Sequence, residues 1–309
     1  NPALEDDSSH AWGFVVTSLD FSQDGRYILA GCGDGDCHVF EVATNIERFC
    51  LIEGHGNGNS PRCSRWDPAN RFIASCGADR QVIVWEMPRD LDEQRSTVSS
   101  EKISRSFALE GHKGSVNCLS WSPGSDRLVS ASDDCSLLVW DLGPRLALGA
   151  LRQHSAPVLS CLFSSSGWYI VSSSFDASVV IWSADEFQVH YLLRQHPGAV
   201  YSLALSESEE TLVSGGSDGL FIVWDLRGVL PDDLLQGARE QQVSRKELSE
   251  TLRGCMADEG EEEPPGSRLQ HRGEVRALHV SHGASFAISG GSDGKLILTG
   301  LRGNSSLRN

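Results

Sequence analysis

Two serines of this 309-residue chain stand in a pattern that presents a nucleophile in hydrolases. Ser217 and Ser292 are each the centre of a Gly-x-Ser-x-Gly motif, within two copies of SGGSDG. Such a nucleophile needs a helix directly after it, because the sharp strand-to-helix turn exposes the hydroxyl. The following residues, LFIVW and KLIL, are strand-like instead. A hydrolase using Ser217 is therefore kept only as a remote alternative.

The cysteines and histidines form no recognised metal-binding motif. The sequence has no paired Cys-x-x-Cys, no His-Glu-x-x-His and no phosphate-binding Gly-x-x-x-x-Gly-Lys-Ser/Thr. Cys32, Cys37 and His38 are close in sequence, but alternating strand residues point to opposite faces, so we expect no site there. The expectation is a protein that is not an enzyme and carries no metal or cofactor.

An internal repeat of about 42 residues accounts for most of the chain. Its clearest copy is GHKGSVNCLSWSPGSDRLVSASDDCSLLVWDL, residues 111–142. Six aspartates each lie six residues before a strand position: Asp34 before Phe40, Asp79 before Trp85, Asp134 before Trp140, Asp176 before Trp182, Asp218 before Trp224 and Asp293 before Thr299. A histidine lies 22 or 24 residues before each aspartate: His10, His55, His112, His154, His196 and His271. Four residues before the aspartates stand Ala30, Ser75, Ser130, Ser172, Ser214 and Ser289.

Between these marks, each copy reads as three short strands separated by turn residues, with room for a fourth strand. Four antiparallel strands per repeat at this spacing predict the blade of a β-propeller. The sequence therefore predicts an all-β fold of four-stranded blades, with six repeats readable and a six- or seven-bladed propeller.

The Gly-His, Ser-x-x-x-Asp and Trp-Asp marks resemble those of the WD-repeat (WD40) family over about residues 10 to 300. The resemblance implies that His, Ser, Asp and Trp of one repeat form a hydrogen-bonded chain inside the blade. The implied structural chains are His55, Ser75, Asp79 and Trp85; His112, Ser130, Asp134 and Trp140; His154, Ser172, Asp176 and Trp182; and His196, Ser214, Asp218 and Trp224. The first repeat has Ala30 and Phe40 and the last has Thr299, so we expect these two blades to lack a complete chain.

We expect a single propeller domain over 1–309, with repeats at about 10–50, 51–88, 107–144, 150–186, 192–227 and 268–302. Two insertions interrupt it. Residues 89–105 are expected to form a polar loop, and residues 228–267 an acidic, partly helical or disordered segment with ten acidic and four basic residues, a net charge of −6. The chain does not begin with Met, so we expect it to be part of a larger protein.

The composition of the chain excludes some classes of binding partner. A net charge of −16 argues against nucleic acid, because phosphate binding needs clustered Lys and Arg. The apolar runs are of strand length, so no membrane insertion is expected. Nine cysteines in strand-like contexts indicate free thiols and an intracellular location, cytoplasmic or nuclear. Other proteins or peptides remain as partners, and the oligomeric state is left open.

A scaffold that assembles a multiprotein complex is the function these features favour, since propeller rims offer rigid contact surfaces. Aromatic, Arg and Lys side chains at the variable rim positions are the candidate contacts. They are Trp12, Phe14, Arg62, Lys113, Phe175, Tyr201, Arg272 and Arg276. An alternative rests on the Trp-Asp-x-Arg end of LVSGGSDGLFIVWDLR, which resembles the box of cullin-4-type ubiquitin ligase substrate receptors. In that reading Asp225 and Arg227 contact the adaptor.

Overall fold

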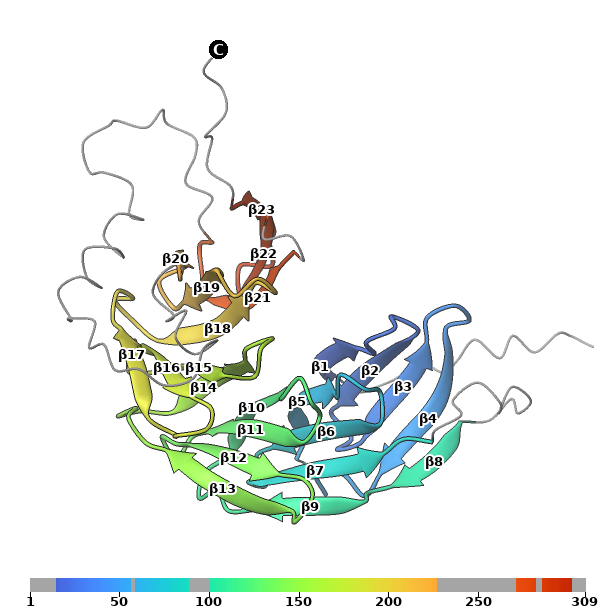
Figure 1. Cartoon of the computed structure of the whole chain (residues 1–309). Coiled ribbons are helices and arrows are strands. Elements are labelled where there is room, and N and C mark those ends of the chain that lie inside the picture. The colour runs from blue at the N-terminus through green and yellow to red at the C-terminus, as the bar shows by residue number, and fades with distance from the viewer. Residues whose placement is uncertain (1–14, 57–58, 89–99, 227–270, 282–284, 302–309) are drawn as a thin grey trace, which may run out of the picture. The chain divides into compact units, whose positions relative to one another are not determined.

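The computed structural model describes residues 15–56, 59–88, 100–226, 271–281 and 285–301, and every regular element in these ranges is a β-strand (Figure 1). The chain divides into two compact units, residues 1–110 and 111–309. The predicted all-β fold, built from antiparallel sheets of blade type, is confirmed for the described residues.

The first unit contains two sheets, blades 1 and 2. Blade 1 consists of β1 (Val16–Phe21), β2 (Tyr27–Cys32), β3 (Cys37–Glu41) and β4 (Ile46–Ile52), with β8 (Glu101–Ser104) added beside β4. Blade 2 consists of β5 (Pro61–Trp66), β6 (Phe72–Gly77), β7 (Gln81–Glu86) and β9 (Phe107–Glu110).

The second unit contains four further sheets, blades 3 to 6. Blade 3 is β10 (Val116–Trp121), β11 (Arg127–Ser132), β12 (Leu137–Asp141) and β13 (Leu146–Leu151). Blade 4 is β14 (Val158–Phe163), β15 (Tyr169–Ser174), β16 (Val179–Ser183) and β17 (Val189–Leu193). Blade 5 is β18 (Val200–Leu205), β19 (Thr211–Gly216) and β20 (Phe221–Asp225), and blade 6 is β21 (Val275–Val280), β22 (Phe286–Gly291) and β23 (Leu296–Gly300).

The turn between the second and third strands has the same design in all six blades. The aspartate carboxylate accepts a hydrogen bond from the amide two residues later, at 3.0 to 3.2 Å. The residue directly after the aspartate has positive φ: Gly35, Arg80, Cys135, Ala177, Gly219 and Gly294. This explains two glycines of the SGGSDG copies, because glycine adopts that conformation without steric cost. Ser217 lies in such a turn between β19 and β20, so no helix follows it.

The cores lie between neighbouring blades. In the first unit, Leu29, Val39 and Ile73 are fully buried in one cluster that extends over both blades. In the second unit β10, β14, β18 and β21 lie side by side, and the blades pack around them. The repeat tryptophans Trp85, Trp140, Trp182 and Trp224 are among the largest fully buried side chains. Burying each of them contributes a large apolar area, on the order of 150–250 Å².

The first insertion is not a loop throughout. Its residues Glu101–Ser104 form β8, which pairs in parallel with β4 at the outer edge of blade 1. The chain therefore returns from blade 2 to blade 1 before it adds β9 to blade 2. Residues 228–267 lie outside the described residues. Within the ranges that are described, no helix has the length and apolar character needed to cross a membrane.

Candidate protein-binding rim

Blades 3 and 4 each contain a complete chain of hydrogen bonds from the rim to the core. In blade 3 the imidazole of His112 contacts Asp134 at 2.9 Å and the Ser130 hydroxyl at 2.7 Å, and the Trp140 indole donates to that hydroxyl at 2.8 Å. Blade 4 repeats the arrangement with distances of 3.0, 2.8 and 2.8 Å. Because the histidines and serines are buried, each chain fixes its rim loop to the sheet.

Blade 2 differs from the implied chain at its tryptophan. His55 contacts Asp79 at 2.9 Å and Ser75 at 2.7 Å. The indole of Trp85, however, donates to the carbonyl of Ile52 at 3.1 Å, and Ser75 receives no bond from it. The assignment of Trp85 to this chain is therefore wrong, because the indole finds its acceptor on the neighbouring blade 1.

Blades 5 and 6 contain shorter chains. In blade 5, His196 and Trp224 both contact the Ser214 hydroxyl, but His196 Nδ1 is 4.0 Å from Asp218 and has no hydrogen-bond partner. In blade 6, His271 contacts both Asp293 and Ser289, while Thr299 replaces the tryptophan. The chain of blade 5 is therefore open at the rim end, and that of blade 6 at the core end.

In the complete chains of blades 3 and 4, the surroundings fix the protonation states of the histidine and the aspartate. Burial lowers the pKa of His112 and His154, and it outweighs the facing aspartates, so both imidazoles are neutral donors. Burial by itself raises the pKa of Asp134, but hydrogen bonds from the Ser136 hydroxyl, the Lys113 amide and the imidazole lower it to about 2. A neutral imidazole thus donates to an ionised carboxylate.

The rim side chains arise from a β-bulge that recurs in every blade. The register between the first and second strands shifts near the start of the first strand in all six sheets. A bulge inserts one unpaired residue and re-aims its side chain. The bulged residues are Thr17, Arg62, Asn117, Leu159, Tyr201 and Arg276. Three of the sequence candidates, Arg62, Tyr201 and Arg276, hold this position.

Two of those candidates meet at the rim of blades 5 and 6. The guanidinium of Arg276 lies 5.8 Å from the centre of the Tyr201 ring, and Glu274 accepts from both the Tyr201 hydroxyl at 3.2 Å and Arg276 at 2.6 Å. Glu274 was not predicted from the sequence. Its position directly before the first residue of β21, Val275, could have indicated it. The three side chains hold each other in place while Arg276 stays exposed.

The remaining candidates are distributed over several loops. Lys113 and Arg272 are exposed and follow the buried histidines of blades 3 and 6, and Phe175 is 56 % exposed in the turn after β15. Arg62 is exposed in the first unit. Trp12, Phe14 and Arg227 lie outside the described residues, and Asp225 is the last residue of β20.

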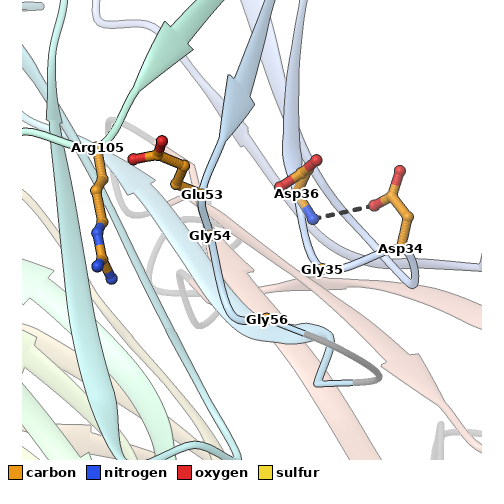
Figure 2. Close-up of a pocket in the computed structure, with 7 residues that line it drawn as sticks. All are labelled: Asp34, Gly35, Asp36, Glu53, Gly54, Gly56 and Arg105. Atoms are coloured by element: carbon orange, nitrogen blue, oxygen red, sulfur yellow. Dashed lines mark hydrogen bonds between the residues drawn. The ribbon is translucent and has the colours of Figure 1, made fainter.

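A pocket of about 370 Å³ opens in the first unit between the β2–β3 turn of blade 1 and the segment after β4 (Figure 2). Its lining carries the carboxylates of Asp34, Asp36 and Glu53 and the guanidinium of Arg105. The lining thus contains three acidic residues and one basic residue, a balance that favours positively charged ligands.

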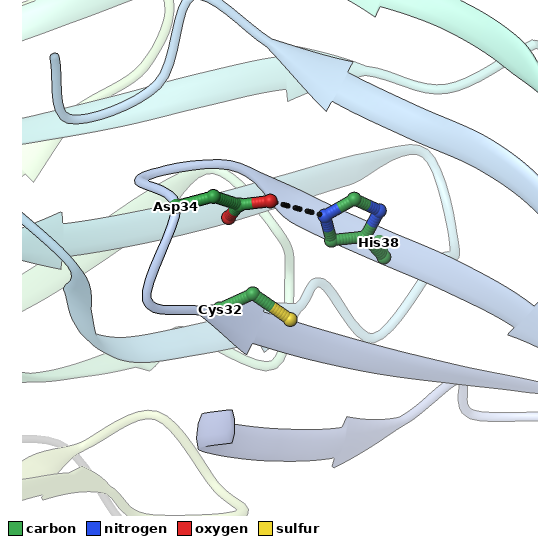
Figure 3. Close-up of side chains that lie close together, drawn as sticks. All are labelled: Cys32, Asp34 and His38. Carbon is green, nitrogen blue, oxygen red and sulfur yellow. Dashed lines mark hydrogen bonds and ion pairs between the residues drawn. The ribbon is translucent and has the colours of Figure 1, made fainter. Parts of the chain in front are cut away.

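Blade 1 carries a polar cluster around Cys32 and His38, where the sequence led us to expect no site. His38 contacts Asp34 at 3.1 Å through Nε2 and Glu47 at 2.8 Å through Nδ1, and Cys32 lies beside the first pair (Figure 3). The expectation that Cys32 and His38 point to different faces is wrong. They belong to different strands, β2 and β3, and the turn between them places both on one face.

Electrostatics in this cluster differ from those of the other blades. Burial by itself lowers the pKa of His38, but hydrogen bonds to Cys50, Glu47 and Asp34 raise it to about 10. Burial, together with nearby carboxylates, also raises the pKa of the Cys32 thiol to about 11. The imidazole is thus a cation held between carboxylates.

Comparison with known proteins identifies the family. The model of the WD domain, G-beta repeat, matches residues 7–41, 47–86, 103–141, 147–183 and 187–225. The chain therefore belongs to the WD40 repeat family, and the resemblance seen in the sequence is confirmed. Blade 6 lies beyond the matched repeats, although its His271, Ser289 and Asp293 retain the repeat's contacts.

The relatives share only part of the chain. It is similar to actin-interacting protein 1-2 of Arabidopsis thaliana, with 26% identity over 42% of this chain and 19% of the relative. It is also similar to a WD repeat-containing protein WDS homolog of Arabidopsis thaliana (30% identity; 41% and 22%) and to WD repeat-containing protein 1 of Gallus gallus (26%; 48% and 23%). The matched region thus spans about a fifth of the length of these relatives. WD-repeat proteins are generally protein-interaction scaffolds.

Proposed function

We propose that this chain is a non-catalytic scaffold that binds a protein or peptide through the rim of its second unit. The cluster of Tyr201, Glu274 and Arg276 carries the proposal. An aromatic ring, a carboxylate and an exposed guanidinium are held together across two blades there. Tyr and Arg are the residue types most enriched in the energetically dominant parts of interfaces.

Preorganised loops support this proposal. In blades 3, 4 and 6 the aspartate also accepts from the amide of the residue after the histidine, at 2.8 Å for Lys113, 2.9 Å for Ser155 and 3.0 Å for Arg272. The exposed side chains therefore project from backbone that is already fixed, and less entropy is lost on binding. Phe175 adds an exposed ring at the same end of blade 4. A partner that offers carboxylates beside apolar side chains fits these groups.

Affinity purification with mass spectrometry tests the proposal. The full chain with Phe175→Ala and Arg276→Ala is compared with the wild type, and Leu146→Ala is the matched control. Leu146 is 62 % exposed on β13, away from the rim, so it removes a similar apolar surface elsewhere. We expect specific partners to be lost with the rim variant and retained with the control. Retention by both variants would contradict the use of this rim.

Two alternatives from the sequence gain no support from the described residues. The ligase receptor depends on Asp225 and Arg227, of which only Asp225 is described. An adaptor pull-down sensitive to Arg227→Ala would favour it. The hydrolase depends on Ser217, which lies between two strands and lacks the helix that a nucleophile elbow needs.

A further inference from the structure

Blade 1 concentrates metal-ligating side chains at positions where its sister blades have small or aliphatic ones. His38 pairs across the sheet with Ala30 and Cys50. The equivalent partners are Ser130, Leu138 and Ala150 in blade 3, and Ser172, Val180 and Leu192 in blade 4. Cys32 lies two residues before its aspartate, where blades 3 and 4 have serine. The cluster is therefore a local departure from the repeat pattern.

We propose that Cys32, Asp34 and His38 form a zinc-binding site in blade 1. Their ligand atoms all lie within 4.8 Å of one another. A thiolate, an imidazole and a carboxylate are the three ligand types that Zn²⁺ accepts in proteins. A tetrahedral ion with bonds of about 2.0 to 2.3 Å holds its ligand atoms about 3.3 to 3.8 Å apart. Nε2 of His38 and the Asp34 carboxylate, at 3.1 Å, are already at about this separation, and the Cys32 sulfur lies within 4.8 Å of both.

Glu47 completes the site from the outside. Metal-binding histidines usually donate their second ring N–H to a carboxylate, which fixes the ring and its tautomer. Nδ1 of His38 makes this contact with Glu47 at 2.8 Å, while Nε2 faces Asp34 at 3.1 Å. Cys50 lies near the Glu47 side of the ring, so it is not among the assigned ligands. Binding replaces the thiol proton of Cys32 and the Nε2 proton of His38, and both protons go to solvent.

The acidic pocket supplies the entry path. Asp34 belongs to both the cluster and the pocket, where Asp36 and Glu53 add two further carboxylates (Figures 2 and 3). Such a lining raises the local concentration of cations. Three protein ligands leave the fourth position of a tetrahedral ion to water or to a ligand atom from the pocket.

Titration of the full chain with ZnCl₂, and with CoCl₂ as a spectroscopic probe, tests the site. We expect one ion per chain and a thiolate-to-cobalt charge-transfer band. Cys32→Ser should abolish the band, and His38→Leu, which introduces the residue of blade 3, should abolish zinc binding. Glu47→Ala should weaken binding by about 10- to 100-fold. Cys50→Ser is the matched control and should retain both binding and the band.

Circular dichroism of each variant separates loss of binding from loss of folding. The proposal is overturned if the folded wild-type chain binds no stoichiometric zinc or cobalt. It is equally overturned if Cys50→Ser abolishes binding while Cys32→Ser does not, because the ion would then occupy the Glu47 side of the ring. If a variant fails to fold, the test rests on the charge-transfer band of the wild type and of Cys50→Ser. The proposal requires the band in both, and its absence from the folded wild type overturns the proposal.

Discussion

In blades 1 and 3 the equivalent turn aspartates, Asp34 and Asp134, each contact an imidazole, but the two imidazoles come from different positions of the repeat. In blade 3, His112 reaches Asp134 from the loop before the first strand, and Ser130 connects that histidine to Trp140. In blade 1, the imidazole comes from His38 on β3, four residues after Asp34. Ala30 and Phe40 stand at the positions of the serine and the tryptophan.

The comparison separates two roles of the aspartate. Both carboxylates accept from the amide two residues later, so both close the turn. Of these two blades, only blade 3 has a carboxylate that also connects the rim to the buried tryptophan, through His112 and Ser130. The turn role therefore accounts for the aspartate in every repeat, whereas the histidine, serine and tryptophan form an additional cross-link. Blade 1 has no such cross-link, and its turn aspartate belongs instead to the cluster of His38, Asp34 and Glu47.

Asp134→Ala should give the largest loss of stability. It removes the acceptor of His112, the Lys113 amide and the Ser136 hydroxyl together. Two of these donors, His112 and Ser136, are buried, and a buried donor without a partner costs about 1–3 kcal/mol, so we expect a total loss of about 3 kcal/mol. Urea unfolding measured by tryptophan fluorescence provides the check.

Asp185→Ala is the control for that change. Asp185 pairs with Arg127 at 2.7 Å, but its side chain is 55 % exposed, so this surface pair should contribute less than about 1 kcal/mol. Equal losses for the two variants would show that the chain of blade 3 adds nothing beyond an ordinary surface contact.

Ser130→Ala should destabilise the protein more than Ser75→Ala. The Ser130 hydroxyl accepts from Trp140 and also contacts His112, whereas Ser75 contacts His55 and receives no bond from Trp85. The change in blade 3 leaves one more buried donor without a partner, which costs about 1–3 kcal/mol. The difference between the two urea midpoints measures it, and equal midpoints would contradict the assignment of the Trp85 indole to Ile52.

Acidification should weaken the complete chains before it affects their aspartates. The folded-state pKa of His112 lies below the ordinary 6.5, so its contribution is present above 6.5 and is lost as pH falls through the lowered value. Asp134 contributes above its ordinary 3.8, and this is lost as pH falls toward about 2. Unfolding free energies of the wild type and His112→Asn from pH 7.5 to 5 should differ less at the acidic end. A difference that grows on acidification would mean that the folded imidazole prefers to be charged.

The repeat marks were sufficient to predict the strands and the turns, and the resemblance to the WD-repeat family implied most of the polar contacts. The constant spacing of His112, Ser130 and Asp134 shows the repeat, and the family resemblance then implies the contacts among them. Contacts between different repeats have no such spacing. The bond of Trp85 to Ile52 and the meeting of Tyr201 with Glu274 depend on how neighbouring blades pack, which periodicity does not encode. The cluster around His38 was rejected because strand alternation was applied across Cys32 and His38, although a turn separates them and they lie on two paired strands.

Asp218→Asn in blade 5 should have the smallest effect on stability, and it tests whether His196 and Asp218 are separated as described. His196 Nδ1 lies 4.0 Å from Asp218 and makes no hydrogen bond, while the turn bond to the Leu220 amide at 3.2 Å can be kept by an asparagine. We expect a loss below about 1 kcal/mol, against about 2 kcal/mol for Asp134→Asn, whose charged acceptor is engaged by the imidazole. Both variants keep the side-chain shape, but Asp134 also accepts from the Lys113 amide and the Ser136 hydroxyl, so its urea midpoint reports these bonds together with the histidine contact. If Asp218→Asn costs as much as Asp134→Asn, the chain of blade 5 is closed in solution, and the open rim end described for that blade is not a property of the protein.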